Sequence, residues 1–229
     1  CSVDEIINKA YETNILFLCN PNNPTGKIVP RQELERLILR LRRKKTILVL
    51  DEAFIDLEKR ESIIDLAVKN DNLLVLRSMT KFFGLPGLRL GYAVGSINHI
   101  RRIENFGQPW PVNVFAQSAG ELIIKDKNFE KKAKKKLLNE REYLYRQLRQ
   151  IKGLEPFPSS ANFILIKIEG RTSSHQLQSL LIKRNLLIRD CSNFRGLGNK
   201  YIRVAVRKRT ENKILLNELE NILGQKGRK

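Results

Sequence analysis

Three short apolar runs, each ending in a polar stretch, constrain the fold of this chain most strongly. The runs occupy residues 15–19, 46–50 and 73–76, and helical patterns separate them. Continuous apolar runs of this length are typical of buried strands, and strands that alternate with helices indicate a parallel α/β sheet. Parallel strands of this kind end at one edge of the sheet, where α/β proteins bind ligands. We therefore expect the three polar stretches to converge.

The polar stretches contain side chains suited to a cofactor that carries both an aldehyde and a phosphate. Lys81 lies between the hydroxyls of Ser78 and Thr80 and the guanidinium of Arg89. A lysine amine can form a Schiff base, and hydroxyls with a guanidinium can bind a phosphate. Asp51 follows the second run and could pair with a protonated ring nitrogen, so the set indicates pyridoxal 5'-phosphate (PLP). Taken alone, Lys81 could equally be a solvated loop charge and Asp51 a helix cap.

The net charge of +19 comes from 43 Lys and Arg against 24 Asp and Glu. The densest basic runs are residues 42–45, 131–136 and 207–209. Such runs can bind nucleic acid, but few aromatic residues are interleaved with them to stack on bases. Solvated helix faces therefore explain the charge better, and a nucleic-acid partner is not expected.

The cysteines Cys1, Cys19 and Cys191 lie far apart and show no metal-ligand spacing. Their odd number fits a reducing cytoplasm, and we expect neither a metal site nor a disulfide framework. No apolar run approaches the roughly 20 residues of a membrane helix. The chain starts at Cys1 without a methionine, and we interpret it as a piece of a longer protein or a processed product.

Two domains are expected. Residues 1–149 hold the apolar runs and form the PLP-binding large domain. A long charged helix near residues 127–150 leads from it to a smaller α+β domain, residues 150–229. In that domain residues 201–206 alternate between apolar and other side chains, which predicts a half-buried strand, and a short strand is expected at residues 186–188.

Three motifs, in this order and spacing, resemble the fold-type I PLP-dependent enzymes of the aspartate aminotransferase superfamily. They are NPNNPTG at residues 20–26, LVLDEAF at 48–54 and SMTKFFGLPGLRLGY at 78–92. The resemblance runs over residues 15–209 and is strongest to the branch that holds threonine-phosphate decarboxylase and histidinol-phosphate aminotransferase. It implies a PLP-dependent transferase-like fold, with a mostly parallel large-domain sheet and a smaller C-terminal domain.

The resemblance also implies a role for each matching residue at the cofactor. Lys81 would be the Schiff-base lysine, Asp51 would pair with the pyridine nitrogen, and Asn23 would bond the ring oxygen. The residues that would bind the cofactor phosphate are Ser78, Thr80 and Arg89. Phe54 stands where many aminotransferases have a tyrosine that bonds the ring oxygen, so that contact is absent here.

Three further stretches bear on the substrate. Residues 188–198 and 201–207, together with QPWPVN at 108–113, look more like the decarboxylases than the aminotransferases. By this resemblance Arg203 would bind the substrate α-carboxylate, with Asn162 as a further candidate beside it, and Arg189 would contact the substrate phosphate. The reaction implied is decarboxylation of L-threonine O-3-phosphate to aminopropanol phosphate, a step of cobalamin biosynthesis. Histidinol-phosphate amino transfer is the alternative, and an inactive or nucleic-acid-binding derivative of the fold is a second alternative.

The family's N-terminal third has no counterpart in this sequence. In the family that part supplies a phosphate loop, an aromatic ring stacked on the cofactor and a tyrosine that reaches the neighbouring subunit. The resemblance therefore implies a cytoplasmic homodimer for the full-length form, whereas the activity of the chain as given stays open.

Overall fold

The computed structural model describes residues 3–10 and 13–224, so Cys1 lies outside the described residues. The chain divides into two compact units, one formed by Cys1–Asn22 with Ile28–Lys131 and the other by Asn23–Lys27 with Lys132–Lys229. The boundary between the units lies within the helix Lys127–Leu148, between Lys131 and Lys132. The division into domains after residue 149 stays a prediction.

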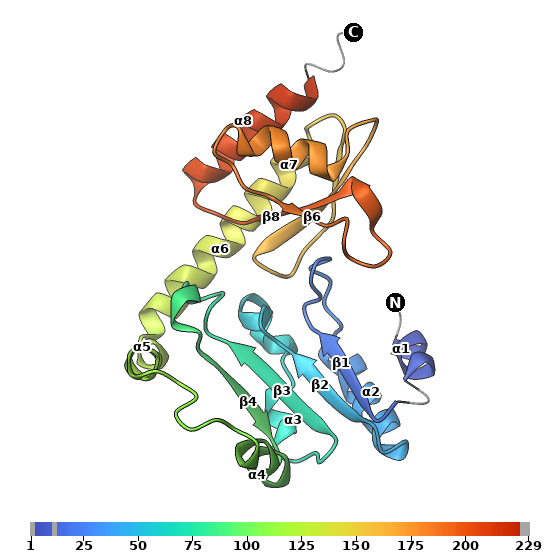
Figure 1. Ribbon diagram of the computed structural model, residues 1–229, viewed down its shortest axis with the longest axis vertical. Coiled ribbons are helices and arrows are strands. Elements are labelled where there is room, and N and C mark those ends of the chain that lie inside the picture. Colours follow the sequence, from blue (N-terminus) through green and yellow to red (C-terminus); the bar gives the residue numbers. More distant parts are fainter. Residues whose placement is uncertain (1–2, 11–12, 225–229) are drawn as a thin grey trace. The chain divides into compact units, whose positions relative to one another are not determined.

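The first unit contains a four-stranded sheet in the order β1-β2-β3-β4 (Figure 1). The strands are β1 (Ile15–Cys19), β2 (Ile47–Asp51), β3 (Leu73–Ser78) and β4 (Gly91–Gly95). β1, β2 and β3 are parallel, and β4 pairs with β3 in the antiparallel sense. The predicted mostly parallel α/β sheet is confirmed.

The helices of this unit follow the strands in alternation. They are α1 (Val3–Lys9), α2 (Arg31–Arg43), η1 (Ile55–Glu61), α3 (Ile64–Ala67), η2 (Pro86–Leu88), α4 (Ile97–Asn105) and α5 (Val114–Lys125). α2 buries a stripe at helical spacing, Leu34, Leu37, Ile38 and Leu41, in one cluster with the sheet residues Leu48, Leu50, Leu73 and Val75. Burial of this stripe orients α2 against the sheet and closes one of its faces.

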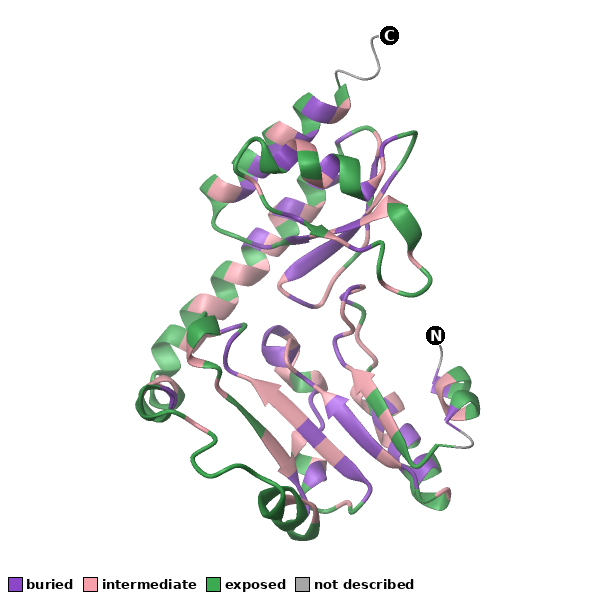
Figure 2. Cartoon of the chain, viewed as in Figure 1, coloured by how far each residue is buried: buried purple, intermediate pink, exposed green. Residues whose placement is uncertain are grey.

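The pleat of the sheet sorts the side chains of the first unit onto two faces. Leu48 and Leu50 of β2 lie in the helix-covered core, and so does Val75 of β3. Since side chains alternate along a strand, Val49 and Asp51 point to the opposite face. Figure 2 shows buried residues concentrated in the central strands and in the helix turns that meet them.

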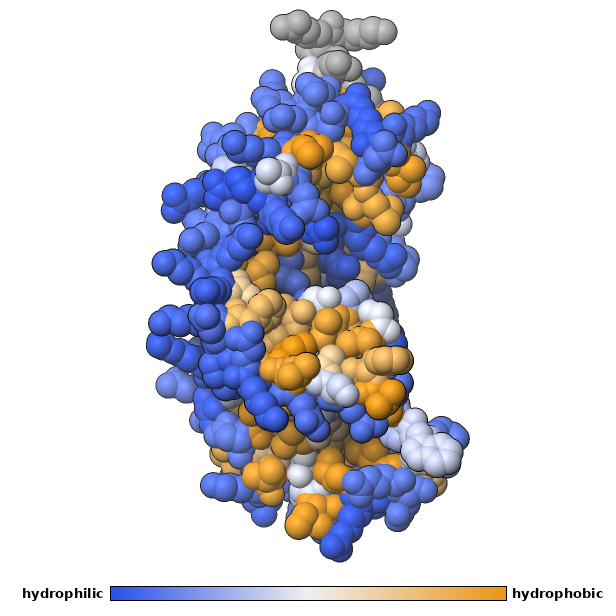
Figure 3. Space-filling model, turned by 90° about the vertical axis from the view of Figure 1, so that its left-hand side faces the viewer, coloured by the Kyte–Doolittle hydropathy of each residue, from blue (hydrophilic) through white to orange (hydrophobic). Residues whose placement is uncertain are grey.

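The first apolar run corrects the expectation that all three strands are buried. β1 is the edge strand, and Phe17 at its centre is 74% exposed, while Leu16 and Leu18 pack against the core on the other face. The apolar run predicted a strand buried on both faces, but no described residue covers the outer face of Phe17. α5 also exposes apolar side chains, and Figure 3 shows apolar residues gathered on the side where this helix lies: Val114, Phe115, Leu122 and Ile124.

The second unit contains an antiparallel sheet in the order β5-β6-β8-β7. Its strands are β5 (Leu154–Pro156), β6 (Phe163–Ile168), β7 (Arg189–Asp190) and β8 (Tyr201–Ala205), with the short turn η3 (Gly198–Lys200) before β8. The helices are α6 (Lys127–Leu148), which begins in the first unit, α7 (Ser174–Ile182) and α8 (Arg209–Gly224). The short strand expected at residues 186–188 is wrong, because pairing with β8 starts only at Arg189.

Alternation along β6 and β8 builds the core of the second unit. Ile164 and Ile166 of β6 and Ile202 and Val204 of β8 pack with residues of α6, α7 and α8 in one cluster. α7 begins with a capping box, in which Ser173 accepts from the Gln176 amide and the Gln176 side chain accepts from the Ser173 amide. The half-buried pattern predicted for residues 201–206 is confirmed for β8.

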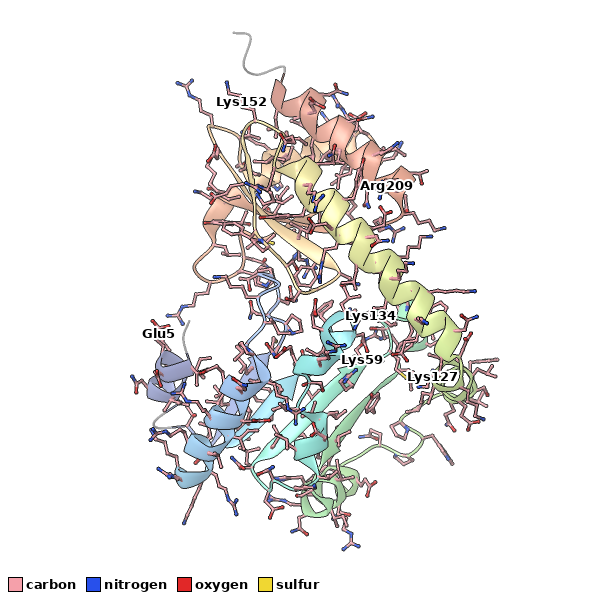
Figure 4. All side chains as sticks on the ribbon, turned by 180° about the vertical axis from the view of Figure 1, so that it is seen from behind. Glu5, Lys59, Lys127, Lys134, Lys152 and Arg209 are labelled. Atoms are coloured by element: carbon pink, nitrogen blue, oxygen red, sulfur yellow. The ribbon has the colours of Figure 1, made fainter. Side chains whose placement is uncertain are left out.

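Charged side chains cover the helices of both units, as the sticks of Figure 4 show. Within residues 3–10 and 13–224, no helix is long and apolar enough to cross a membrane. The same residues hold no cluster of His, Cys, Asp and Glu that could bind a metal ion.

One charged group in the second unit is buried and paired. The Glu140 carboxylate of α6 accepts hydrogen bonds from Arg209 Nε at 3.0 Å and from Asn212 Nδ2 at 3.1 Å. The Arg209 guanidinium also lies 3.6 Å from the centre of the Tyr143 ring. The hydrogen bond from Arg209 is the main cause that lowers the pKa of Glu140 below its ordinary value of 4.5.

We predict that Glu140→Gln destabilises the protein at neutral pH and loses this effect in acid. A carboxyl group whose pKa is lowered by folding stabilises the fold above its ordinary pKa, and this contribution is lost as pH falls through the lowered pKa. Urea unfolding of parent and variant between about pH 7 and about pH 3 measures the difference in stability. Glu142→Gln, which breaks the exposed pair of Glu142 with Arg146, is the control and should change stability less at neutral pH. A pH-independent loss in Glu140→Gln would contradict the prediction.

Candidate functional site

The carboxyl ends of β2 and β3 place two predicted site residues on one face of the first sheet. Asp51 ends β2 and pairs in register with Leu76 of β3. Ser78 lies two residues beyond Leu76, so the alternation of β3 places it on the same face as Leu76 and Asp51. Asp51 Oδ1 accepts a hydrogen bond of 2.9 Å from the Ala53 amide, which fixes the carboxylate at the strand end.

The segment after β3 holds two hydroxyls together. Ser78 Oγ and Thr80 Oγ1 are 2.8 Å apart, and the Thr80 amide lies 3.3 Å from Ser78 Oγ. The Met79 amide donates to the Leu90 carbonyl at 3.1 Å, which ties this segment to the start of β4. Two adjacent hydroxyls on an anchored turn form a donor set that suits a phosphate.

Lys81 is exposed, and its Nζ lies 5.7 Å from the centre of the Phe54 ring. Phe54 thus contacts the lysine at the position where the resemblance has a tyrosine. Arg89 is also exposed, has a left-handed backbone with φ of 55°, and donates from Nη1 to the Pro86 carbonyl at 3.1 Å. Both cations keep donor groups in solvent, where an anionic or electrophilic ligand can reach them.

The NPNNPTG motif of residues 20–26, called the asparagine loop below, brings Asn23 to Arg203, the predicted carboxylate-binding arginine of the second unit. Arg203 Nη1 donates to Asn23 Oδ1, and its guanidinium lies 4.8 Å from the centre of the Phe163 ring. The loop is held further by the Ser160 amide, which donates to the Gly26 carbonyl at 2.8 Å. These contacts fix the planar guanidinium at one orientation, as bidentate carboxylate binding requires.

The two predicted substrate arginines are cross-strand neighbours. Arg189 of β7 pairs in register with Arg203 of β8, which places both on the face opposite the core of the second unit. Arg189 Nη2 donates to Asn193 Oδ1 at 3.0 Å, and its guanidinium lies 5.6 Å from the Phe194 ring centre. Burial, with a smaller effect from Arg189, lowers the pKa of Arg203. Two positive side chains on neighbouring strands favour an anion between or beside them.

For Asn162 the structure shows a backbone contact. Its backbone carbonyl accepts from the Val206 amide at 2.9 Å and so extends the pairing of β6 and β8. Its proposed place near the substrate carboxylate stays a prediction, as do the roles of the other site residues.

Sequence reasoning missed two contacts at the candidate site. Cys19 pairs in register with Asp51, and its thiol lies 3.8 Å from Asp51 Oδ2 as a weak donor. Phe163 supports Arg203 through its ring. The signal for Cys19 was present, since it ends the first apolar run as Asp51 ends the β2 strand, but only the register shows that they meet.

The sheet, the acid at the end of β2 and the lysine segment after β3 define a class, the PLP-dependent enzymes of fold type I. The chain belongs to the aminotransferase class I and II family, whose model matches residues 2–219. The resemblance drawn from the motifs is therefore confirmed.

Individual relatives point to two activities. The chain is 39% identical over 214 residues to the threonine-phosphate decarboxylase of Salmonella typhimurium, covering 93% of this chain and 58% of that protein. It is 33% identical over 226 residues to the histidinol-phosphate aminotransferase of Methanococcus aeolicus, covering 96% and 59%. The crystal structure of the histidinol-phosphate aminotransferase from Clostridium acetobutylicum superposes with a TM-score of 0.92 at 29% identity, covering 97% of this chain and 68% of that one. The chain thus spans about 60% of the length of its curated relatives.

We predict that Gly26→Ala destabilises the protein more than Gly84→Ala. Both glycines have a left-handed backbone, with φ of 67° and 69°, so both variants carry the backbone strain of about 1 kcal/mol. At Gly26 a Cβ would also meet Ser159 Oγ at 2.1 Å, whereas at Gly84 nothing lies within 4 Å. We expect a further loss of about 1–3 kcal/mol for Gly26→Ala, measured by urea unfolding. Equal losses would show that the asparagine loop does not depend on this close packing.

Proposed function

We propose that this chain is the cofactor- and substrate-binding part of a PLP-dependent enzyme that decarboxylates L-threonine O-3-phosphate. The observation that carries the proposal is the shared face of Asp51 and Ser78 at the carboxyl ends of neighbouring strands, with Lys81 three residues further on. This arrangement supplies an acid, an amine and phosphate donors at one sheet edge. Membership of the aminotransferase class I and II family supports PLP as the cofactor.

In the first unit the described side chains fit PLP. Lys81 would hold the cofactor through a Schiff base, since its side chain is exposed. Asp51 would keep the ring nitrogen protonated. The phosphate would be bound by the hydroxyl pair of Ser78 and Thr80 together with Arg89.

In the second unit the arginine pair would bind the anionic groups of the substrate. Arg203 is held by Asn23 and Phe163 and would pair with the α-carboxylate. Arg189, its cross-strand neighbour, would bind the substrate phosphate, with Asn162 near the carboxylate. Asn23 would also bond the ring oxygen of the cofactor.

When bound, PLP supplies an electron sink for cleavage of a bond to the substrate α-carbon. The protein's part would be to orient the substrate on the cofactor. Arg203 and Arg189 would hold the two anionic ends of the substrate and so select the bond to the carboxylate. Lys81 would carry the proton to the α-carbon after carbon dioxide leaves.

Histidinol-phosphate amino transfer is the second candidate, favoured by the TM-score of 0.92 with the Clostridium acetobutylicum enzyme. Both candidate substrates carry a phosphate, so the arginine pair serves either reaction. Higher identity to the Salmonella decarboxylase, 39% against 33%, and Phe54 in place of the tyrosine support decarboxylation. A role in cobalamin biosynthesis would follow from that reaction.

We further propose that the full-length form is a homodimer and that its additional part covers apolar surface exposed in this chain. The relatives are longer than this chain, which spans about 60% of their length. Phe17 of β1 and Phe115 of α5 are 74% and 75% exposed, although large aromatic side chains usually gain stability from burial.

We predict that the chain with added PLP shows a near-visible absorption band that Lys81→Ala abolishes. The band arises from the Schiff base, so removal of the amine removes it. Lys69→Ala, which removes an exposed lysine of the same unit, is the control and should keep the band. Absence of the band in the parent chain would contradict cofactor binding and favour an inactive derivative of the fold.

We predict that the full-length form releases carbon dioxide from L-threonine O-3-phosphate. Arg203→Lys should lower kcat/KM by roughly 10²-fold or more, because lysine cannot form the bidentate pair that orients the carboxylate. Arg43→Lys, at the exposed end of α2, is the control and should leave kcat/KM unchanged. Amino transfer from histidinol phosphate to a keto acid, without carbon dioxide release, would establish the second candidate instead.

A further inference from the structure

A largely buried arginine joins the two strands that carry the candidate cofactor residues. Arg77 directly precedes Ser78 in β3, and its side chain is only 9% exposed. Its Nη1 donates to Glu52 Oε2 at 3.3 Å and its Nη2 donates to Asp56 Oδ1 at 2.9 Å. One guanidinium therefore bridges two carboxylates from the segment that follows β2.

Glu52, the residue after Asp51, is fully buried, and its carboxylate accepts three hydrogen bonds. Besides Arg77, it accepts from Ser62 Oγ at 2.6 Å and from the Ile63 amide at 3.0 Å. Its own amide donates to the Leu76 carbonyl at 2.9 Å and so continues the β2–β3 pairing by one residue. Glu52 thus ties β2, β3 and the start of α3 together.

Asp56 of η1 is 4% exposed and is the less satisfied carboxylate. Its Oδ2 has no hydrogen-bond partner among the described residues, and it lines a pocket of about 220 Å³ together with Arg77 and Ser78. Burial raises the pKa of both Asp56 and Glu52, while the charge of Arg77 opposes the rise in each. Loss of the Arg77 charge would leave both buried carboxylates without their shared cation.

The three charged groups lie behind the candidate cofactor residues. Asp51 and Ser78 share one face of the sheet. Glu52, which follows Asp51, and Arg77, which precedes Ser78, point to the other face. A shift of the Glu52 or Arg77 side chain would move the backbone that carries Asp51 or Ser78. The network therefore acts on the backbone at both cofactor residues at once, since Glu52 is bonded to Asp51 and Arg77 is bonded to Ser78.

We propose that the Glu52–Arg77–Asp56 network positions Asp51 and Ser78 for cofactor binding, with Arg77 as its central positioning residue. This inference rests on the proposed function for the identity of the ligand. A buried ion network contributes little net stability compared with apolar packing, but it accepts only the arrangement in which every charge is paired. Such a network suits the carboxyl ends of β2 and β3, where Asp51 and Ser78 must keep a fixed position relative to each other.

The test compares Arg77→Met with Leu37→Ala. Leu37 is buried in α2, so Leu37→Ala lowers overall stability through a cavity without touching the network. Hydrogen exchange without cofactor is measured at the amides of Glu52, Ala53, Met79 and Thr80. We expect Arg77→Met to exchange about tenfold faster at these amides than Leu37→Ala, at denaturant concentrations that match overall stability.

Cofactor binding gives the second measurement. The Kd for PLP, from titration of the near-visible band, should rise about tenfold in Arg77→Met and stay near the parent value in Leu37→Ala. Equal exchange at the four amides in the two variants, or an unchanged Kd in Arg77→Met, would overturn the proposal. If Arg77→Met does not fold, Asp56→Asn, which keeps the shape of the side chain, decides by the same two criteria.

Failure of the proposed function is distinguishable from failure of this inference. A parent chain that shows no near-visible band with PLP contradicts the proposed function. The exchange comparison needs no cofactor, so it still shows whether Arg77 fixes the ends of β2 and β3.

Discussion

Alternation of side chains across β2 and β3 is the constraint on which the rest of the first unit depends. One face of these strands carries Leu48, Leu50 and Val75 into the core beneath α2, and the other carries Asp51 and Ser78. A shift of register by one residue would bury the acid and expose the leucines. The hydrophobic core and the candidate cofactor site are therefore specified by the same pairing, and neither can slip without the other.

The same separation organises the second unit with a different sheet. Ile164, Ile202 and Val204 enter the core, while Arg203 lies on the opposite face beside Arg189. An arginine on a bare antiparallel face would sample many rotamers. The Phe163 ring beneath Arg203 and the Asn23 amide at its edge restrict it, so that less conformational entropy is lost when a carboxylate binds.

The strands of this fold could be predicted from the sequence where a short, continuous apolar run marks them. The runs that became β2 and β3 were found because burial on both faces removes polar residues from a strand. Phe17 was misjudged by the same rule, since composition cannot distinguish a central strand from an edge strand whose outer face is bare. Lys81, Asp51 and Arg203 were selected through motifs, whereas no motif pairs Arg77 with Glu52, which lies 25 residues away in the sequence. Only the register of two strands shows that they pair.

The consecutive acids Asp51 and Glu52 show why residue type alone does not assign a role. Two carboxylates next to each other in sequence could be taken for an acid–base pair. The strand end points them to opposite faces, and Glu52 is fully buried among a hydroxyl, an amide and a guanidinium, while Asp51 keeps a face that is only partly covered. The Glu52 carboxylate accepts three hydrogen bonds, whereas among the described residues Asp51 accepts one from the Ala53 amide and a weak one from the Cys19 thiol. This difference supports Asp51 as the acid that meets the cofactor in the proposed function, and it fits the proposed role of Glu52 in holding the backbone that presents Asp51.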